Sequence, residues 1–106
     1  MLSVFARCHQ GEPIVFMEPA SLNFAIDSTV TVQCKATAYP APTFTWRRNG
    51  DPVDVSERIA FNETTGVLTI KSATLEDAGE WDCIGTNQLG VGEASVTLNY
   101  IGKRWL

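Results

Sequence analysis

The sequence feature that most constrains the fold is the segment from Leu68 to Cys83. Leu68 and Ile70 alternate with polar residues. After a polar turn, Trp81 and Cys83 resume the same alternation. A period of two indicates strands that each bury one face, because successive side chains of a strand point to opposite sides. We therefore predict that Leu68, Ile70 and Trp81 belong to the core of a β-structure.

The same pattern recurs along the rest of the chain. Val30–Ala36 and Ala94–Tyr100 alternate clearly, and Ile14–Met17 is predicted as an edge strand that continues, after a kink, through Leu22–Ile26. Turn-forming residues recur about every 8–12 residues, and no segment has the apolar spacing of a three-turn helix. The pattern predicts an all-β, Greek-key sandwich of two antiparallel sheets, with one short helical turn near Ala73–Asp77.

The chain has three cysteines, and alternation turns two of them toward the core. Cys34 and Cys83 both lie on the inward side of their predicted strands, so we predict a disulfide between them. Cys8 is left over, either as a free thiol on a tail or as half of a bridge to a preceding module. Trp46 follows Cys34 in another alternating segment and is a predicted core residue.

The 106 residues suit one domain. We place this domain at residues 13–100, after a tail or linker at 1–12 and before a tail at 101–106. The chain carries 8 basic and 12 acidic residues, a net charge of -4. This balance disfavours nucleic acid as a partner, because phosphate binding needs a clustered basic face. No apolar run reaches the roughly 18 residues of a membrane span, so we expect no membrane insertion by this segment.

The sequence offers little for catalysis. Its single histidine, His9, lies in the N-terminal tail. No His and Cys cluster has metal-ligand spacing, and no glycine-rich segment has the phosphate-loop pattern. A nucleophile, base and acid cannot be assembled without an imidazole in the folded part. We therefore expect no enzymatic activity, no metal and no cofactor.

A set of residues spread over about 13–100 carries a family resemblance. They are Cys34, Pro40–Pro42, Trp46, Asn49–Gly50, Arg58, Leu68–Ile70, Asp77–Gly79, Cys83, Asn87 and Gly90. On these residues the chain resembles the intermediate-set (I-set) immunoglobulin domains of adhesion molecules, matrix proteins and muscle giants. The resemblance implies an immunoglobulin-like sandwich with Trp46 packed across the disulfide. It also implies a partly buried salt bridge between Arg58 and Asp77.

The chain departs from the family at three positions. Trp81 stands where the family usually has a tyrosine, whose hydroxyl ties a corner to the backbone. Because indole offers one N–H and no hydroxyl, that hydrogen bond must be remade or lost. Asp27 and Tyr39 stand where the family often has glycine. Tyr39 either supports the proline-rich loop that follows it or presents an aromatic contact at the loop tip.

The resemblance implies a non-catalytic protein-binding and spacer module of a multidomain extracellular adhesion, matrix or receptor protein. Its partners would be other proteins, including neighbouring immunoglobulin-like modules or a second copy of itself. The alternative is a structural module of a giant cytosolic muscle or cytoskeletal protein, in which the cysteines stay reduced. An immune-type receptor domain is a third interpretation, and it requires an extra pair of strands after Asn49. Candidate partner contacts are Arg47, Arg48, Tyr39 and Gln88.

Asn62, Glu63 and Thr64 fit the pattern for N-glycosylation. They fall in a predicted exposed hairpin, so Asn62 is a candidate glycosylation site in a secreted protein. The apolar run Met1–Ala6 is shorter than the roughly 7–15 residues of a signal-peptide core. We accordingly expect this chain to be one segment of a longer extracellular protein.

Overall fold

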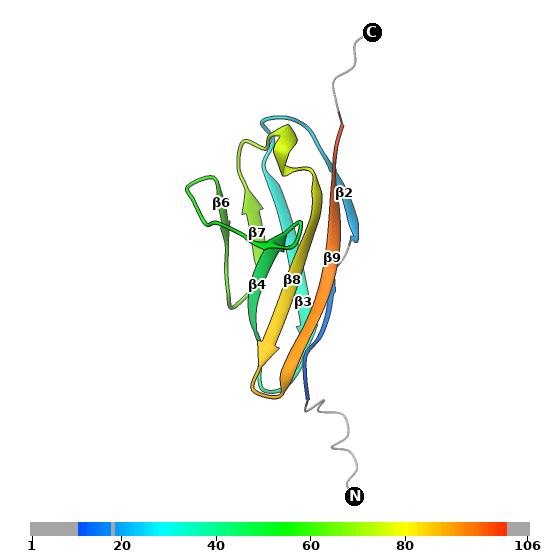
Figure 1. Ribbon diagram of the computed structural model, residues 1–106, viewed down its shortest axis with the longest axis vertical. Helices are drawn as coiled ribbons and strands as arrows, with labels where there is room; N and C mark the ends of the chain where they lie inside the picture. Colours follow the sequence, from blue (N-terminus) through cyan, green and yellow to red (C-terminus); the bar gives the residue numbers. More distant parts are fainter. Residues whose placement is uncertain (1–10, 18, 102–106) are drawn as a thin grey trace, which may run out of the picture.

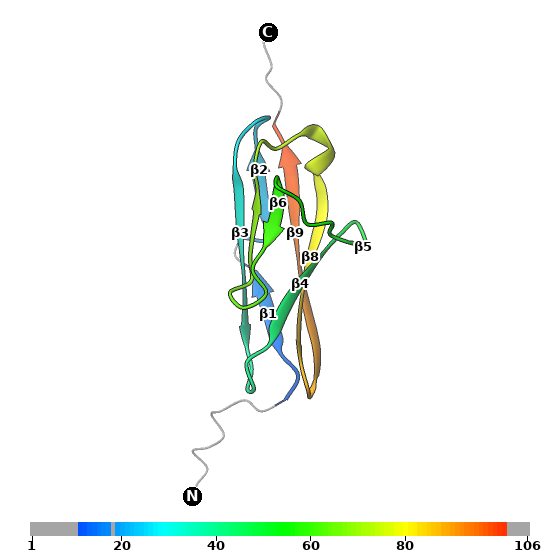
Figure 2. The same ribbon diagram turned by 90° about the vertical axis from the view of Figure 1, so that its left-hand side faces the viewer.

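The computed structural model describes residues 11–17 and 19–101. Two β-sheets pack face to face, with strand orders β1-β3-β7-β6 and β2-β9-β8-β4-β5 (Figure 1). Figure 2 shows the two layers edge on. The strands are β1 (Ile14–Met17), β2 (Ser21–Phe24), β3 (Val30–Thr37), β4 (Thr43–Arg48), β5 (Asp51–Pro52), β6 (Ile59–Phe61), β7 (Val67–Ile70), β8 (Gly79–Asn87) and β9 (Gly90–Tyr100). This all-β sandwich is the fold class that the sequence predicts.

Alternating apolar residues determine which face each strand buries. In β3, the side chains of Val30, Val32 and Cys34 are buried. Antiparallel pairing sets Val30 opposite Ile70 and Val32 opposite Leu68 on β7, and all four are buried. A slip of one residue would turn each of these apolar sets toward solvent, so the hydrophobic pattern specifies the register.

The first strand is divided between the two sheets. β1 pairs antiparallel with β3, whereas β2 pairs in parallel with β9. This parallel pair departs from the two fully antiparallel sheets that we expected. The physical reason is that the chain changes sheets between Met17 and Ser21 without reversing direction. β2 therefore has the same direction as β9.

The core is centred on the disulfide between Cys34 and Cys83, which joins β3 to β8 and therefore one sheet to the other. Trp46 on β4 lies opposite Cys83 in register and is buried, as is Trp81 two residues earlier on β8. The disulfide and both indole rings are thus part of one buried cluster.

The segment after Asn49 contains one strand of two residues, β5, which pairs with the end of β4. Asn49 and Gly50 form the turn between them, and both have positive φ angles of 50° and 91°, as a tight hairpin turn requires. Residues 53–58 contain no strand. The extra strand pair of an immune-type receptor domain is therefore not present in this segment, and that interpretation is wrong.

The short helical turn expected near residues 73–77 is the 3₁₀ helix η2 (Leu75–Asp77). Thr74 precedes it, and the Asp77 side chain accepts a hydrogen bond from the Thr74 backbone N–H at 2.8 Å. Within 11–17 and 19–101, no helix combines the length and apolar character needed to cross a membrane.

Candidate functional site

An ion pair between Arg58 and Asp77 closes one end of the sandwich. Nη1 of Arg58 donates to Oδ2 of Asp77 at 2.7 Å, and Nη2 donates to Oδ1 at 3.2 Å. This is the two-point match between a guanidinium and a carboxylate. Asp77 is 0% exposed, and a carboxylate at such a position needs partners because a buried unpaired charge is strongly unfavourable.

The surroundings of Asp77 favour its charged form. Burial is the largest single influence, and by itself it would raise the pKa of Asp77, because it penalises the charged carboxylate. Hydrogen bonds from Arg58 and from the Thr74 backbone, together with the charges of Arg58 and Arg48, outweigh burial and lower the pKa below its ordinary value. The hydrogen bond to Asp77 in turn raises the pKa of Arg58. The pair is therefore ionised at neutral pH.

Arg48 belongs to this end of the core and not to the exposed face on which we predicted a partner contact. Its Nη1 lies 3.8 Å from Oδ1 of Asp77, and its Nη2 donates to the backbone carbonyl of Glu76. The guanidinium carbon stands 5.2 Å from the ring centroid of Trp81, close enough for a cation–π contact. Strand alternation explains the correction, because Trp46 two residues earlier points inward from the same strand.

Two other predicted contacts, Tyr39 and Gln88, lie at the opposite end of the sandwich. Both are exposed. The end is held together by Asn87, whose Nδ2 donates to the carbonyl oxygens of Pro40 and Gly11, each at 3.0 Å. One amide therefore joins the loop after β3, the β8–β9 turn and the start of the described chain.

Arg47 lies apart from these two residues, on the exposed face of β4. It stands opposite Asp82 of β8. From Asp82, β8 continues for five residues before it reaches Asn87 at that end, a distance of about 17 Å along a strand. The structure therefore does not bring Arg47 together with Tyr39 and Gln88 in one patch.

Exposed apolar side chains gather at the end that holds Tyr39, a feature not predicted from the sequence. We call Tyr39, Leu89 and Val91 the entry pole. All three are at least half exposed, and the Leu89 N–H donates to Oδ1 of Asn87 at 2.8 Å. The available signal in the sequence was Leu89, an apolar residue in the turn between β8 and β9, where no strand face can bury it.

A second apolar group lies at the other end, and we call Ile26, Leu75 and Ile101 the exit pole. All three side chains are exposed. The Ile101 N–H donates to the Phe24 carbonyl at 2.8 Å, and the Asp27 N–H donates to the Ala73 carbonyl at 2.8 Å. These bonds gather the β2–β3 turn, the loop before η2 and the end of β9 at one pole. Asp27 has a φ of 69°, the conformation that glycine often supplies in the family.

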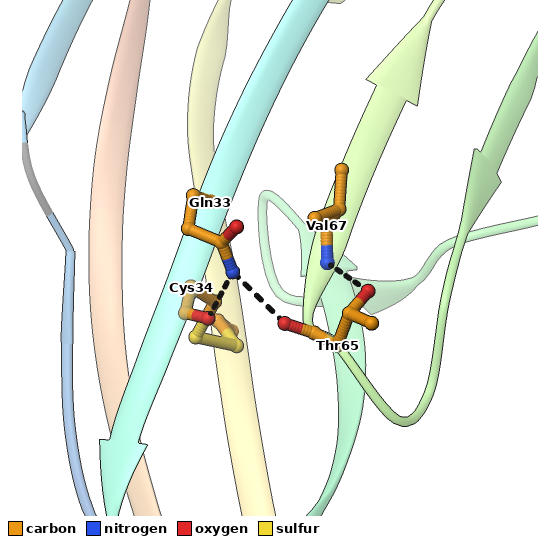
Figure 3. The surroundings of a disulfide bond; sticks show 5 residues. Gln33, Cys34, Thr65 and Val67 are labelled. Atoms are coloured by element: carbon orange, nitrogen blue, oxygen red, sulfur yellow. Dashed lines mark hydrogen bonds between the residues drawn. A yellow bond between two sulfur atoms is a disulfide. The ribbon is translucent and has the colours of Figure 1, made fainter.

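Asn62 opens the turn that links β6 to β7. Its Oδ1 accepts the backbone N–H groups of Thr64 at 2.8 Å and Thr65 at 3.0 Å. Figure 3 shows how Gln33 on β3 holds this turn: its Nε2 donates to the carbonyl oxygens of Cys34 at 2.8 Å and Thr65 at 2.9 Å. The turn is thus attached to the strand that carries the disulfide.

Two residues named from the sequence, Cys8 and His9, lie outside the described residues. In the part of the chain that the structure describes, no group of three or more His, Cys, Asp or Glu side chains could hold a metal ion.

Comparison with known proteins agrees with this geometry. The family model described as "Immunoglobulin domain" matches residues 12–87. Neural cell adhesion molecule 1-B of Xenopus laevis is 38% identical over 79 residues, which cover 74% of this chain and 7% of that protein. The chain therefore spans a small part of the length of this relative.

Solved structures share the same architecture. The tandem Ig repeats of Dlar superpose with a TM-score of 0.78 at 25% identity, over 93% of this chain and 53% of that one. Titin domain M7 superposes with a TM-score of 0.75 at 23% identity, over 87% and 96% of the two chains, a likeness that concerns the fold alone. With the bridged two-sheet core and the matched family model, the chain belongs to the immunoglobulin domain family.

Proposed function

We propose that this domain is a non-catalytic protein-binding and spacer module of a multidomain extracellular protein, of the intermediate (I-set) type. Its proposed partners are the modules that precede and follow it in such a protein, together with other immunoglobulin-like surfaces. The similarity to a protein named as a neural cell adhesion molecule supports an adhesion setting.

The observation that carries the proposal is the placement of the exposed apolar residues. β1 begins at one end of the sandwich and β9 finishes at the other (Figure 1). The entry pole and the exit pole lie at these two ends, while the outward residues of β8 and β9 are mainly polar or small. Apolar surface at both ends suits end-to-end contact with neighbouring modules, because removing exposed apolar surface from water favours association.

The disulfide supports a location outside the cell. Bridges such as Cys34–Cys83 form and persist in oxidising compartments and are rare in the cytosol. In the alternative, a module of a cytosolic muscle protein, the same two cysteines would be thiols.

Hydroxyl-radical footprinting tests the spacer role. Leu75 of the exit pole and Leu89 of the entry pole are 60% and 50% exposed, and Val55, in the loop between β5 and β6, is 62% exposed. In the protein with its natural neighbours, we expect Leu75 and Leu89 to be labelled several-fold less than in the 106-residue chain, with Val55 unchanged as the control. Equal labelling of both leucines in the two samples would contradict the proposal.

Labelling of intact cells tests the compartment. We expect a membrane-impermeant amine reagent to label the native protein, and we expect Cys34 and Cys83 to resist alkylation until a reductant is added. A protein that escapes surface labelling and carries both residues as free thiols would be the cytosolic module instead.

A further inference from the structure

We infer that Asn62 carries an N-linked glycan whose first sugar ring lies in a hollow on the outer face of β6 and β7. The inference rests on the proposed extracellular location, because glycan transfer to asparagine takes place in the secretory pathway. It extends the proposed function by naming a modification site and the surface that the modification covers.

The Asn62 side chain is oriented for this modification. Two backbone N–H groups, of Thr64 and Thr65, point at one side-chain atom of Asn62, which must therefore be the acceptor oxygen Oδ1. The amide nitrogen Nδ2 then faces away from the turn, and no hydrogen bond within the described residues uses it. Asn62 itself is exposed. A glycan on Nδ2 therefore displaces no contact of the fold.

The chemistry is a group transfer from a lipid-pyrophosphate-linked oligosaccharide. Nδ2 of Asn62 forms a bond to the anomeric carbon of the first sugar. The bond from that carbon to the phosphate oxygen breaks, and the lipid pyrophosphate leaves with the bonding electrons. The proton lost from Nδ2 passes to the transferase or to solvent, so the charges balance. Thr64 supplies the hydroxyl that completes the acceptor pattern.

A hollow of about 370 Å³ lies directly beside Asn62. The hollow is shallow and open to solvent, so it can contact one face of a single sugar ring without enclosing it. The outward side chains of Ala60 and Val67 give it an apolar lining against which the C–H face of a sugar can pack. Thr65 and Thr69 add hydroxyl groups that can bond to a sugar.

The turn that carries Asn62 is held by both sheets. The backbone N–H of Phe44 on β4 donates to the Glu63 carbonyl at 2.8 Å, and Cys34 on β3 donates to the Gly66 carbonyl at 3.2 Å. A glycan at Asn62 is therefore attached to a fixed point of the sandwich, and its first ring has a defined position relative to the hollow.

The position gives the glycan a physical role. β6 is an edge strand of the four-stranded sheet, and exposed edges invite pairing with another chain. A sugar on Asn62, one residue beyond the end of β6, shields that edge. Contacts between modules through the β6 edge are then disfavoured.

Expression through the secretory pathway of a eukaryotic cell tests the site. We expect most of the protein to carry a glycan that peptide-N-glycanase removes, converting Asn62 to aspartate in the mass spectrum. Thr64→Ala should abolish the modification and Thr64→Ser should keep it. The two variants form a matched pair, because the Thr64 backbone N–H that holds the turn remains in both. A secreted, folded protein with unmodified Asn62 would overturn the inference.

Nuclear Overhauser contacts on the glycosylated protein test the packing. We expect contacts from the first sugar to the methyl groups of Ala60 and Val67, and shifted resonances at Thr69 relative to Thr64→Ala. A modified Asn62 with no such contacts would refute the placement in the hollow. Recombinant secretion tests the site wherever the native protein resides, so failure here is separate from failure of cell-surface labelling, which tests the proposed function.

Discussion

Trp81 donates its indole N–H to the backbone carbonyl of Asp77 over 2.9 Å. The family resemblance implies that the usual tyrosine corner bond must be remade or lost at this position, and the structure has an indole hydrogen bond there instead. The Asp77 side chain accepts hydrogen bonds from Arg58, and the Trp81 ring lies under the guanidinium of Arg48. The Trp81–Asp77 hydrogen bond therefore connects the corner to the ion pair at the same end of the core.

This bond predicts a difference between the two buried indoles. Trp46 and Trp81 are 2% and 0% exposed, but within the described residues nothing accepts a hydrogen bond from Nε1 of Trp46. We expect Trp81→Phe to cost on the order of 2–4 kcal/mol, from a cavity and an unpaired Asp77 carbonyl. Trp46→Phe should cost about 1–2 kcal/mol less, since it removes no accepted hydrogen bond.

Urea unfolding of both variants, followed by circular dichroism, measures the difference. Trp81→Tyr is a useful third variant, because its hydroxyl offers a donor at the same corner. Equal costs for the two phenylalanine variants would show that the Trp81 hydrogen bond adds nothing to stability.

The ion pair predicts a dependence of stability on acid. The pKa of Asp77 is lower in the folded protein than its ordinary value, so the unfolded chain takes up the proton first as the pH falls. The stability that Asp77 contributes is therefore fully present above its unfolded pKa of about 4, and it is lost as the pH falls through the lower, folded value. Free energies of unfolding measured from pH 7 down to about pH 2 should follow this course.

Asp77→Asn provides the comparison. At neutral pH it should destabilise the domain by roughly 1.5–3 kcal/mol, because charge-assisted hydrogen bonds from Arg58 are weakened. Toward low pH the wild type and the variant should converge. If the gap between them stayed constant through the acid range, the ionised carboxylate would not be its source.

The fold was predictable because alternation is a local signal with one physical meaning, and because the Cys–Trp–Cys spacing carries the family resemblance. The split of the first strand was not, because its two halves have similar patterns and the choice of sheet depends on partners distant in sequence. Arg48 was misplaced for a different reason. Its charge suggested solvent, while its position two residues after Trp46 required the inner side. The apolar residues of the entry pole and the exit pole were not predicted to lie together, because they come from separate segments that meet only in the folded chain.

The disulfide supplies a further test. Cys34 and Cys83 are 49 residues apart, and closing a loop of that length restrains the unfolded chain by roughly 4 kcal/mol in the chain-entropy model. We expect the Cys34→Ala/Cys83→Ala double variant to lose about that much stability in guanidinium unfolding, and the wild type in reductant to lose a similar amount. A loss below about 1 kcal/mol in both samples would be inconsistent with a bridge that constrains the unfolded state.

Gly66 predicts how tightly the Asn62 turn is fitted to the disulfide strand. Its φ is 81°, and a Cβ atom there would lie 2.6 Å from the Cys34 carbonyl oxygen. Gly50 is the matched control, because its φ of 91° is similar but a Cβ atom would meet nothing within 4 Å. Gly50→Ala should cost about 1–2 kcal/mol from backbone strain alone. Gly66→Ala should cost at least about twice as much in thermal unfolding, because the β3 backbone must also move. Similar losses for both variants would mean that the turn can shift away from β3, and the first sugar on Asn62 would then have no fixed position over its hollow.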